Sequence, residues 1–174
     1  AGRRRHDARH AGVPAGRRIP TPVSHVDAFP TLLELAGEKM PEGFPGLSLI
    51  DIAHGAKPKR AVLSEYHGMG SSTGVFAIRM SQWKYVHYVG YPAQLFDLDE
   101  DPEELSDVAN DPAYADALEQ CRRALFGICD PNEVDQRAHA RQAELVALNG
   151  GRAAVIERGD FGFTPAPGTV ADFQ

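Results

Sequence analysis

Alternating hydrophobic and polar positions in the middle of the chain predict a small β-sheet. Four short runs are rich in β-branched and aromatic residues: 61–66, 75–80, 83–88 and 94–98. Only Ser81 and Gln82 separate the second run from the third, which predicts a two-residue hairpin. We therefore expect a four-stranded antiparallel sheet, whose core and face positions include Phe76, Ile78, Trp83, Tyr85, Leu95 and Phe96.

Helical spacing flanks this β-rich region on both sides. Before it, apolar residues recur every three to four positions from Val26 to Ala36, behind a capping-type pair of Ser24 and Asp27. Pro30 removes a backbone hydrogen bond, so the first turn is expected to be separate from residues 30–36. After it, residues 102–109, 114–128 and 131–149 predict helices, and the second is expected to cover the sheet with one apolar side. Residues 153–157 predict an edge strand.

The charge of the chain is unevenly distributed. Residues 1–18 contain six Arg and one Asp, whereas the remainder has twelve Lys plus Arg against twenty-three Asp plus Glu. Such an acidic body argues against nucleic acid as the main partner, because phosphate binding relies on positively charged faces. We also expect no membrane partner, because no apolar run approaches the roughly 18 residues of a transmembrane helix.

The two cysteines predict neither a disulfide nor a zinc site. Cys121 and Cys129 lie eight residues apart in a predicted helix, which separates them by about 12 Å along its axis. No histidine has matching zinc-site spacing. We expect both thiols to be buried as small apolar side chains.

A set of motifs in fixed order gives the chain a family resemblance. A strand ending in Arg is followed by a Trp-Lys-Tyr strand, then Leu-Phe-Asp-Leu, then Asp-Pro-x-Glu. These positions are Arg79, Trp83, Lys84, Tyr85, Leu95, Phe96, Asp97, Leu98, Asp101, Pro102 and Glu104. They resemble the carboxyl-terminal signature of the sulfatase family, and residues 24–37 resemble the family's Ser-His-Val-Asp-x-x-Pro-Thr-Leu-Leu helix. The resemblance covers about residues 13–150.

The resemblance implies an α+β fold in four parts: a four-stranded antiparallel sheet with helices packed on one face, plus a detached amino-terminal helix from the large sulfatase domain. Residues 1–19 would form an irregular basic arm and 20–57 a remnant of the large catalytic domain, helix and linker. Residues 58–151 would form the carboxyl-terminal α+β domain and 152–174 an extended tail. Residues 1–12 do not resemble the expected family strand, which suggests a frameshift, a misplaced gene start or the boundary of a cloned fragment.

Sulfatase chemistry, as the resemblance implies it, needs residues that we do not find here. The family oxidises the first residue of Cys/Ser-x-Pro/Ala-x-Arg to formylglycine and uses a divalent cation, calcium being favoured. The segment from Cys129 to Glu133 places an acid where Arg is required, and the segment from Cys121 to Leu125 also fails. We expect no catalytic residue and no metal ligand in this chain, which alone should be inactive.

The acids Asp97, Asp99 and Asp101 are spaced like the start of a calcium loop. However, Pro102 replaces the turn glycine, and Val108 stands where a bidentate Glu is needed. We favour the alternative that these acids cap a helix beginning at Pro102, where negative charge complements the helix dipole.

A glycine-rich loop supplies the candidate site residues. His67, Ser71, Ser72 and Thr73 lie in SEYHGMGSSTG, directly after a predicted strand. By resemblance, this strand end approaches the active-site mouth, so these residues are candidates to contact the part of the substrate remote from sulfate. The alternative is an ordinary polar turn whose His bonds a backbone carbonyl.

The sequence thus indicates the carboxyl-terminal part of a sulfatase, a sulfuric ester hydrolase, that contributes domain packing and the shape of the substrate entrance. Its expected partners are the missing large domain and a second copy of the chain. The alternatives are a noncatalytic assembly or binding module from a truncated gene, and part of a related phosphodiesterase or phosphonate hydrolase. The compartment stays open, with the cytoplasm slightly favoured.

Overall fold

A computed structural model of the chain describes residues 13, 16, 18–56, 60–68 and 71–159. The chain divides into two units, Ala1–Pro131 and Asn132–Gln174. Within the described residues, no helix has the length and apolar character that crossing a membrane would require. The predicted arm at residues 1–19 and the predicted boundary near residue 58 fall largely on residues outside this description, so both stay predictions.

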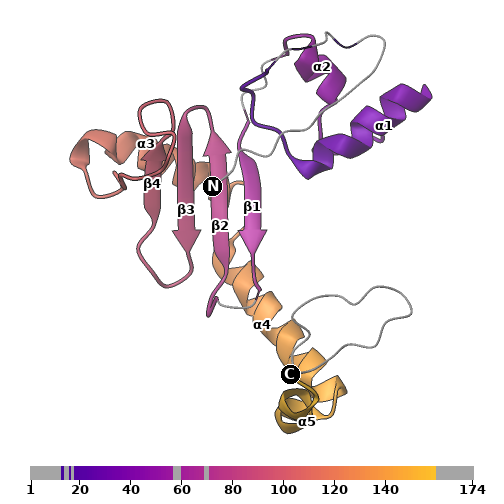
Figure 1. Cartoon of the computed structure of the whole chain (residues 1–174), viewed down its shortest axis with the longest axis vertical. Helices are drawn as coiled ribbons and strands as arrows, with labels where there is room; N and C mark the ends of the chain where they lie inside the picture. The colour runs from indigo at the N-terminus through magenta and orange to yellow at the C-terminus, as the bar shows by residue number, and fades with distance from the viewer. Residues whose placement is uncertain (1–12, 14–15, 17, 57–59, 69–70, 160–174) are drawn as a thin grey trace. The chain divides into compact units, whose positions relative to one another are not determined.

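The first unit contains the predicted four-stranded antiparallel sheet. Its strands are β1 (Val62–Tyr66), β2 (Val75–Met80), β3 (Trp83–Tyr88) and β4 (Gln94–Asp97), and they lie in sequence order (Figure 1). Met80 pairs with Trp83 across the hairpin, and Tyr85 lies between Ile78 of β2 and Leu95 of β4. The sheet and its hairpin are confirmed.

One face of the sheet carries the core. Because side chains alternate along a strand, the register puts Phe76, Ile78, Tyr85 and Leu95 on the same face. Each of them is at most 2% exposed. The expectation that these alternating residues form the core is confirmed, whereas Trp83 at the edge of the hairpin is half-buried.

Helix α3 (Ala115–Phe126) covers this face, as its apolar side predicts. It follows the 3-10 turn η2 (Pro112–Tyr114), packs against β2 and β3, and completely buries Cys121 and Leu125. Aromatic contacts hold both ends of α3 against the sheet. The ring centroids of Trp83 and Tyr114 lie 5.8 Å apart, and those of His87 and Phe126 also lie 5.8 Å apart.

The amino-terminal part of the first unit forms a separate helical layer. The 3-10 turn η1 (His25–Asp27) leads into α1 (Ala28–Ala36), which ends at Gly37 in the left-handed conformation. A shorter helix, α2 (Leu49–Ala53), contacts α1 and is capped by the Ser48 hydroxyl, which accepts from the Ile50 N–H at 3.1 Å. The first turn is separate, as a 3-10 turn that ends at Asp27, but Pro30 does not cause the break: it is the third residue of α1, where an N–H would have no partner within the helix.

Gly46 allows these two helical segments to meet. A Cβ atom at this position would collide with the backbone carbonyl oxygen of Val26 and would lie 2.8 Å from the Phe44 ring. Only a residue without a side chain lets the backbone approach so closely. The segment that enters α2 therefore lies directly against the start of the α1 layer.

The predicted helix at residues 102–109 is wrong. Glu104 has a φ of 60°, which no α-helix accommodates, and the Val108 N–H donates to the Leu95 carbonyl oxygen at 2.9 Å. Acidic side chains hold the segment instead: Asp101 Oδ2 accepts from the Ser106 N–H, and Asp107 Oδ1 accepts from the N–H groups of Leu95 and Ala109. Such short-range bonds compete with helix formation.

The predicted edge strand at residues 153–157 is also wrong. The second unit continues α4 (Pro131–Leu148) into a turn and then α5 (Gly151–Arg158). Gly150 and Gly151 both have positive φ, so they reverse the chain between the two helices. Residues 152–158 of the predicted extended tail are therefore helical, while residues 160–174 lie outside the described part.

Candidate functional site

His67 lies at the end of β1, on the face of the sheet that carries the core. Its ring meets the Phe76 ring edge-on, with centroids 5.3 Å apart, and its Nε2 lies 3.8 Å from Glu65 Oε2. The side chain is 20% exposed. One side of the imidazole is thus held by packing and both ring nitrogens are buried, so the exposed part of the side chain consists of carbon atoms.

The hydroxyl residues of the same loop lie in different environments. The Ser71 hydroxyl donates to the Thr73 carbonyl oxygen at 2.6 Å, and the Ser71 N–H donates to the Gly68 carbonyl oxygen at 3.3 Å. Ser72 is exposed and Thr73 is half-buried. Ser71 therefore shapes the turn, whereas Ser72 is the hydroxyl best placed to meet a partner. Residues 69 and 70 lie outside the described part of the loop.

Asp27 joins the helical layer to the start of the sheet. Its carboxylate accepts from the N–H groups of Ser24 at 2.7 Å and Leu47 at 2.9 Å, and it forms an ion pair with Arg60. The side chain is completely buried. Burial alone raises the pKa of this carboxyl, but the bonds from Arg60, Ser24 and Leu47 outweigh it, so the pKa lies below 3.8.

The three acids that are spaced like the start of a calcium loop do not form a site for a divalent cation. Asp97 Oδ1 accepts from the Asp99 N–H at 3.1 Å, and Asp101 Oδ2 accepts from the Ser106 N–H at 2.8 Å. Across the described residues, no group of three or more His, Cys, Asp or Glu side chains is arranged to hold a metal ion. The acids instead complete the backbone hydrogen bonds of the loop after β4, which corrects their expected role as helix caps.

The two thiols differ in their surroundings. Cys121 lies on α3 and is completely buried, and this burial raises the pKa of its thiol to about 11. Cys129 is only half-buried, so the expectation that both thiols are buried is confirmed for Cys121 and wrong for Cys129. Because the thiolate is the reactive form, Cys121 is a packing residue, as the sequence predicts.

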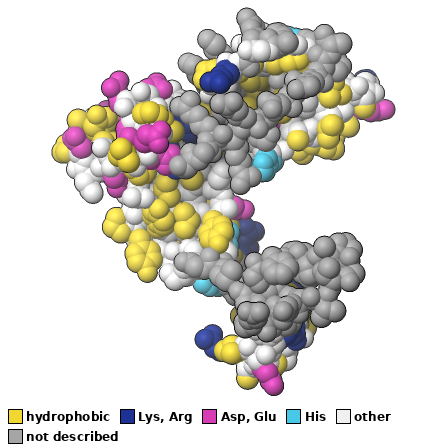
Figure 2. All heavy atoms as spheres, in the orientation of Figure 1, with side chains coloured by type: hydrophobic (Ala, Val, Ile, Leu, Met, Phe, Trp, Pro, Cys, Tyr) yellow, Lys and Arg dark blue, Asp and Glu magenta, His cyan; other side chains and the backbone are white. Residues whose placement is uncertain are grey.

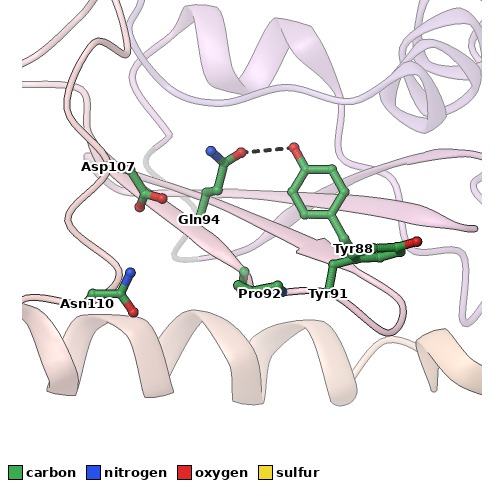
Figure 3. Close-up of a pocket in the computed structure, with 7 residues that line it drawn as sticks. Tyr88, Tyr91, Pro92, Gln94, Asp107 and Asn110 are labelled. Atoms are coloured by element: carbon green, nitrogen blue, oxygen red, sulfur yellow. Dashed lines mark hydrogen bonds between the residues drawn. The ribbon is translucent and has the colours of Figure 1, made fainter.

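An open depression at the turn between β3 and β4 was missed by the sequence reasoning. It has a volume of about 410 Å³. Its lining includes Tyr88, Tyr91, Pro92, Gln94, Asp107 and Asn110 (Figure 3). The signal that could have found it is Gly90-Tyr91-Pro92, which places an aromatic residue on a tight turn between two strands.

The family comparison matches most of the first unit. The family described as "N-sulphoglucosamine sulphohydrolase, C-terminal" matches residues 10–129. Arylsulfatase K of Danio rerio is 36% identical over 137 residues, which cover 74% of this chain and 26% of that protein. Choline-sulfatase of Rhizobium meliloti (strain 1021) is 40% identical over 104 residues, which cover 58% and 20%.

A solved structure that is not named as a sulfatase shares the fold. The phosphonate monoester hydrolase of Agrobacterium radiobacter superposes with a TM-score of 0.52 at 28% identity, covering 65% of this chain and 26% of that one. The chain thus spans about a quarter of the length of the relatives that it matches.

Proposed function

This chain belongs to the sulfatase family, in which it matches the C-terminal domain, and from that premise we propose that it completes an enzyme that hydrolyses sulfuric esters. In this proposal the nucleophile and the metal ligands belong to a large domain outside the chain. The chain supplies a packing surface for that domain and part of the substrate entrance. Formylglycine and a divalent cation would provide the chemistry in the large domain.

The observation that carries the proposal is the exposed apolar side of α1. Four large hydrophobic side chains on one side of η1 and α1 are 42–64% exposed: Val26, Phe29, Leu32 and Leu35. Figure 2 shows hydrophobic side chains along this helix. We call these four residues the α1 apolar face. Burial of such a face is favourable by about 25 cal/mol per Å², so a helix in this state calls for a protein surface to cover it.

The Asp27–Arg60 pair supports the same proposal. It ties the residue before α1 to Arg60, two residues before β1, across the boundary that the sequence predicts near residue 58. The helical layer and the sheet are therefore connected by a buried ion pair as well as by the chain itself. A large domain that binds the α1 apolar face would position the β1–β2 loop at the same time.

The role of that loop is to line the entrance. Carbon atoms of the His67 side chain are exposed while Phe76 holds the ring in place, and Ser72 is exposed five residues later in the same loop. A side chain held in this way loses little conformational freedom when it contacts a substrate. His67, Ser71, Ser72 and Thr73 are accordingly proposed to contact the portion of the substrate remote from the sulfate.

The test begins with the coding DNA upstream of Ala1. We would translate it in all three frames, express any in-frame extension together with this chain, and assay an aryl sulfate and a phosphonate monoester. We expect the extended protein, and not this chain by itself, to hydrolyse the sulfate ester. Sulfate hydrolysis by this chain alone would contradict the proposal, as would an extended protein that folds and cleaves neither ester.

A second assay addresses the entrance. In the extended enzyme, His67→Ala is expected to lower kcat/KM for a bulky sulfate ester while leaving a small aryl sulfate unchanged. Ser64→Ala, an exposed position on the same strand, is the control. Unchanged kinetics with both substrates would show that His67 does not line the substrate entrance.

A phosphonate hydrolase is the second candidate function. The observation that favours it is the structural similarity to the phosphonate monoester hydrolase, at 28% identity. The residues of this chain contact neither sulfur nor phosphorus in the proposal, so they do not distinguish the two esters. The relative rates in the first assay decide between them.

A further inference from the structure

We propose that the depression at the β3–β4 turn binds an unsulfated sugar residue of a glycan, either a neutral or an amino pyranose. The sugar would stack on Tyr91 and would hydrogen-bond to polar side chains on the opposite side. This site is separate from the β1–β2 loop and from the α1 apolar face. Its ligand binding does not depend on the proposed hydrolysis.

An exposed aromatic platform forms one side of the depression. The Tyr91 side chain is 61% exposed although it is large and aromatic, and Pro92 beside it is also exposed. The turn is fixed, because the Tyr91 N–H donates to the Tyr88 carbonyl oxygen at 3.1 Å and Gly90 takes a φ of 81°. A rigid tyrosine offers an apolar ring surface at low entropic cost, and its hydroxyl stays in water.

Oriented polar groups form the other side. The Tyr88 hydroxyl donates to Gln94 Oε1 at 2.9 Å, which leaves the Gln94 amide N–H groups as donors. Asp107 uses Oδ1 for the N–H groups of Leu95 and Ala109, both at 3.0 Å, so its second oxygen is a fixed acceptor. Figure 3 shows Asp107 and Asn110 across the depression from the two tyrosines.

The mixture of these groups matches the chemistry of a sugar. A pyranose has an apolar face of C–H bonds and a rim of hydroxyl groups that both donate and accept hydrogen bonds. The depression offers an aromatic surface, amide donors from Gln94 and a carboxylate acceptor from Asp107. The depression is shallow and largely open to solvent, so a sugar ring would rest against it with one side in water and a glycan can continue beyond it.

The charge of the depression selects against sulfate. The carboxylate of Asp107 repels an anionic group, and no Lys or Arg is among the described residues that line the depression. A sulfated or uronic unit would therefore lose its hydration without gaining a cation. A neutral hydroxyl or an ammonium group pairs well with the same carboxylate.

The test measures binding to the whole chain by NMR titration. The probes are cellohexaose, a hexamer of glucosamine and a heparin hexasaccharide, which represent neutral, amino and sulfated glycans. We expect one or both unsulfated probes to cause saturable shifts of amide signals at the β3–β4 turn, in the millimolar range. Heparin is expected to leave these signals unchanged.

Variants separate the site from nonspecific contact. Tyr91→Ala is expected to weaken binding about tenfold, in line with the worth of an aromatic contact, and Asn110→Ala to weaken it less. Tyr66→Ala, which removes another exposed tyrosine from β1, is the matched control and should bind as the unchanged chain does. The thermal unfolding transition of Tyr91→Ala verifies that this variant is folded.

Three results would overturn the proposal. One is the absence of a saturable response to both unsulfated probes. Another is equal affinity of the unchanged chain and Tyr91→Ala. The third is a stronger response of the same signals to heparin, which would show that the carboxylate does not select against sulfate.

Discussion

At the scale of single residues, Asp27 contributes most to the organisation of the chain. It satisfies two backbone N–H groups and one guanidinium from a position without solvent contact, and these partners come from segments up to 33 residues away. The sequence predicts Asp27 only as a capping residue for the first helix. Its pairing with Arg60 could not be predicted, because sequence spacing carries no information about which distant cation reaches a buried carboxylate.

Replacing Asp27 by Asn is expected to destabilise the chain strongly. Arg60 would keep its charge in a place that is only 17% exposed, without the carboxylate that compensates it. Removal of one partner from a buried pair costs about 3–5 kcal/mol in the free energy of unfolding. Urea unfolding followed by circular dichroism measures this loss.

The control for this variant is the exposed ion pair of Glu119 and Arg122 on α3. Both side chains are nearly half exposed, so Glu119→Gln is expected to change the free energy of unfolding by less than about 1 kcal/mol. Equal effects of the two substitutions would show that burial does not determine the importance of Asp27.

Asp27 also determines how the free energy of unfolding changes as the pH falls. Because the pKa of Asp27 is below 3.8 in the folded chain, the unfolded chain binds the proton more readily. The stabilisation by Asp27 is complete above the unfolded pKa and is lost as the pH falls through the folded pKa. We expect the free energy of unfolding to decrease less in Asp27→Asn than in the unchanged chain between about pH 5 and pH 2; parallel curves would contradict this assignment.

At the scale of elements, the strands were predictable and the acidic segment after them was not. Alternation is clearest in β2, where Phe76 and Ile78 are buried and their neighbours are not. β3 and β4 each bury two adjacent residues and β1 buries none, so their β-branched and aromatic composition was the stronger signal. The segment at residues 102–109 begins like a helix. However, acidic side chains accept hydrogen bonds from nearby backbone N–H groups and from β4, and these bonds override the helix propensity. The glycan site combines residues from β3, a turn, β4 and this same segment, so its assembly depends on the part that pattern alone misassigns.

The β2–β3 hairpin offers a test at this scale. Ser81 has a φ of 51°, a left-handed conformation that is unfavourable for side chains branched at Cβ. Ser81→Val is therefore expected to be about 1–2 kcal/mol less stable than Ser81→Gly, which accepts this conformation without steric cost. Urea unfolding of the two variants makes the comparison, and equal stabilities would show that the turn rearranges. Gln82→Val at the next position serves as the control.

At the scale of the whole molecule, the chain carries the C-terminal domain together with a helix whose apolar side is exposed. The fold class and the family were both accessible from sequence, because the motifs recur in a fixed order from Ser24 to Glu104. The exposure of the α1 apolar face was not predictable from the family motifs, because exposure depends on tertiary packing. The large domain of the proposed function is the partner that would complement this face.

Without that domain, the α1 apolar face is expected to make the chain self-associate. Leu32 is 64% exposed, and burying a leucine contributes about 1.5–3 kcal/mol to association. Leu32→Glu should therefore weaken self-association at least tenfold, which light scattering across micromolar concentrations would detect. Leu105→Glu is the control, because Leu105 is 83% exposed in the loop after β4 and does not belong to the α1 apolar face.

The second unit provides the competing explanation for association. Leu148 of α4 and Ile156 of α5 are 72% and 64% exposed, so this unit also presents apolar side chains to solvent. If Leu148→Glu disperses the chain and Leu32→Glu does not, the association belongs to the second unit and the α1 apolar face loses its support as a docking surface. A monodisperse unchanged chain would contradict both explanations of self-association. Dispersal by Leu32→Glu alone would place the association on the α1 apolar face, which is the result expected if this face is the surface that the proposed large domain covers.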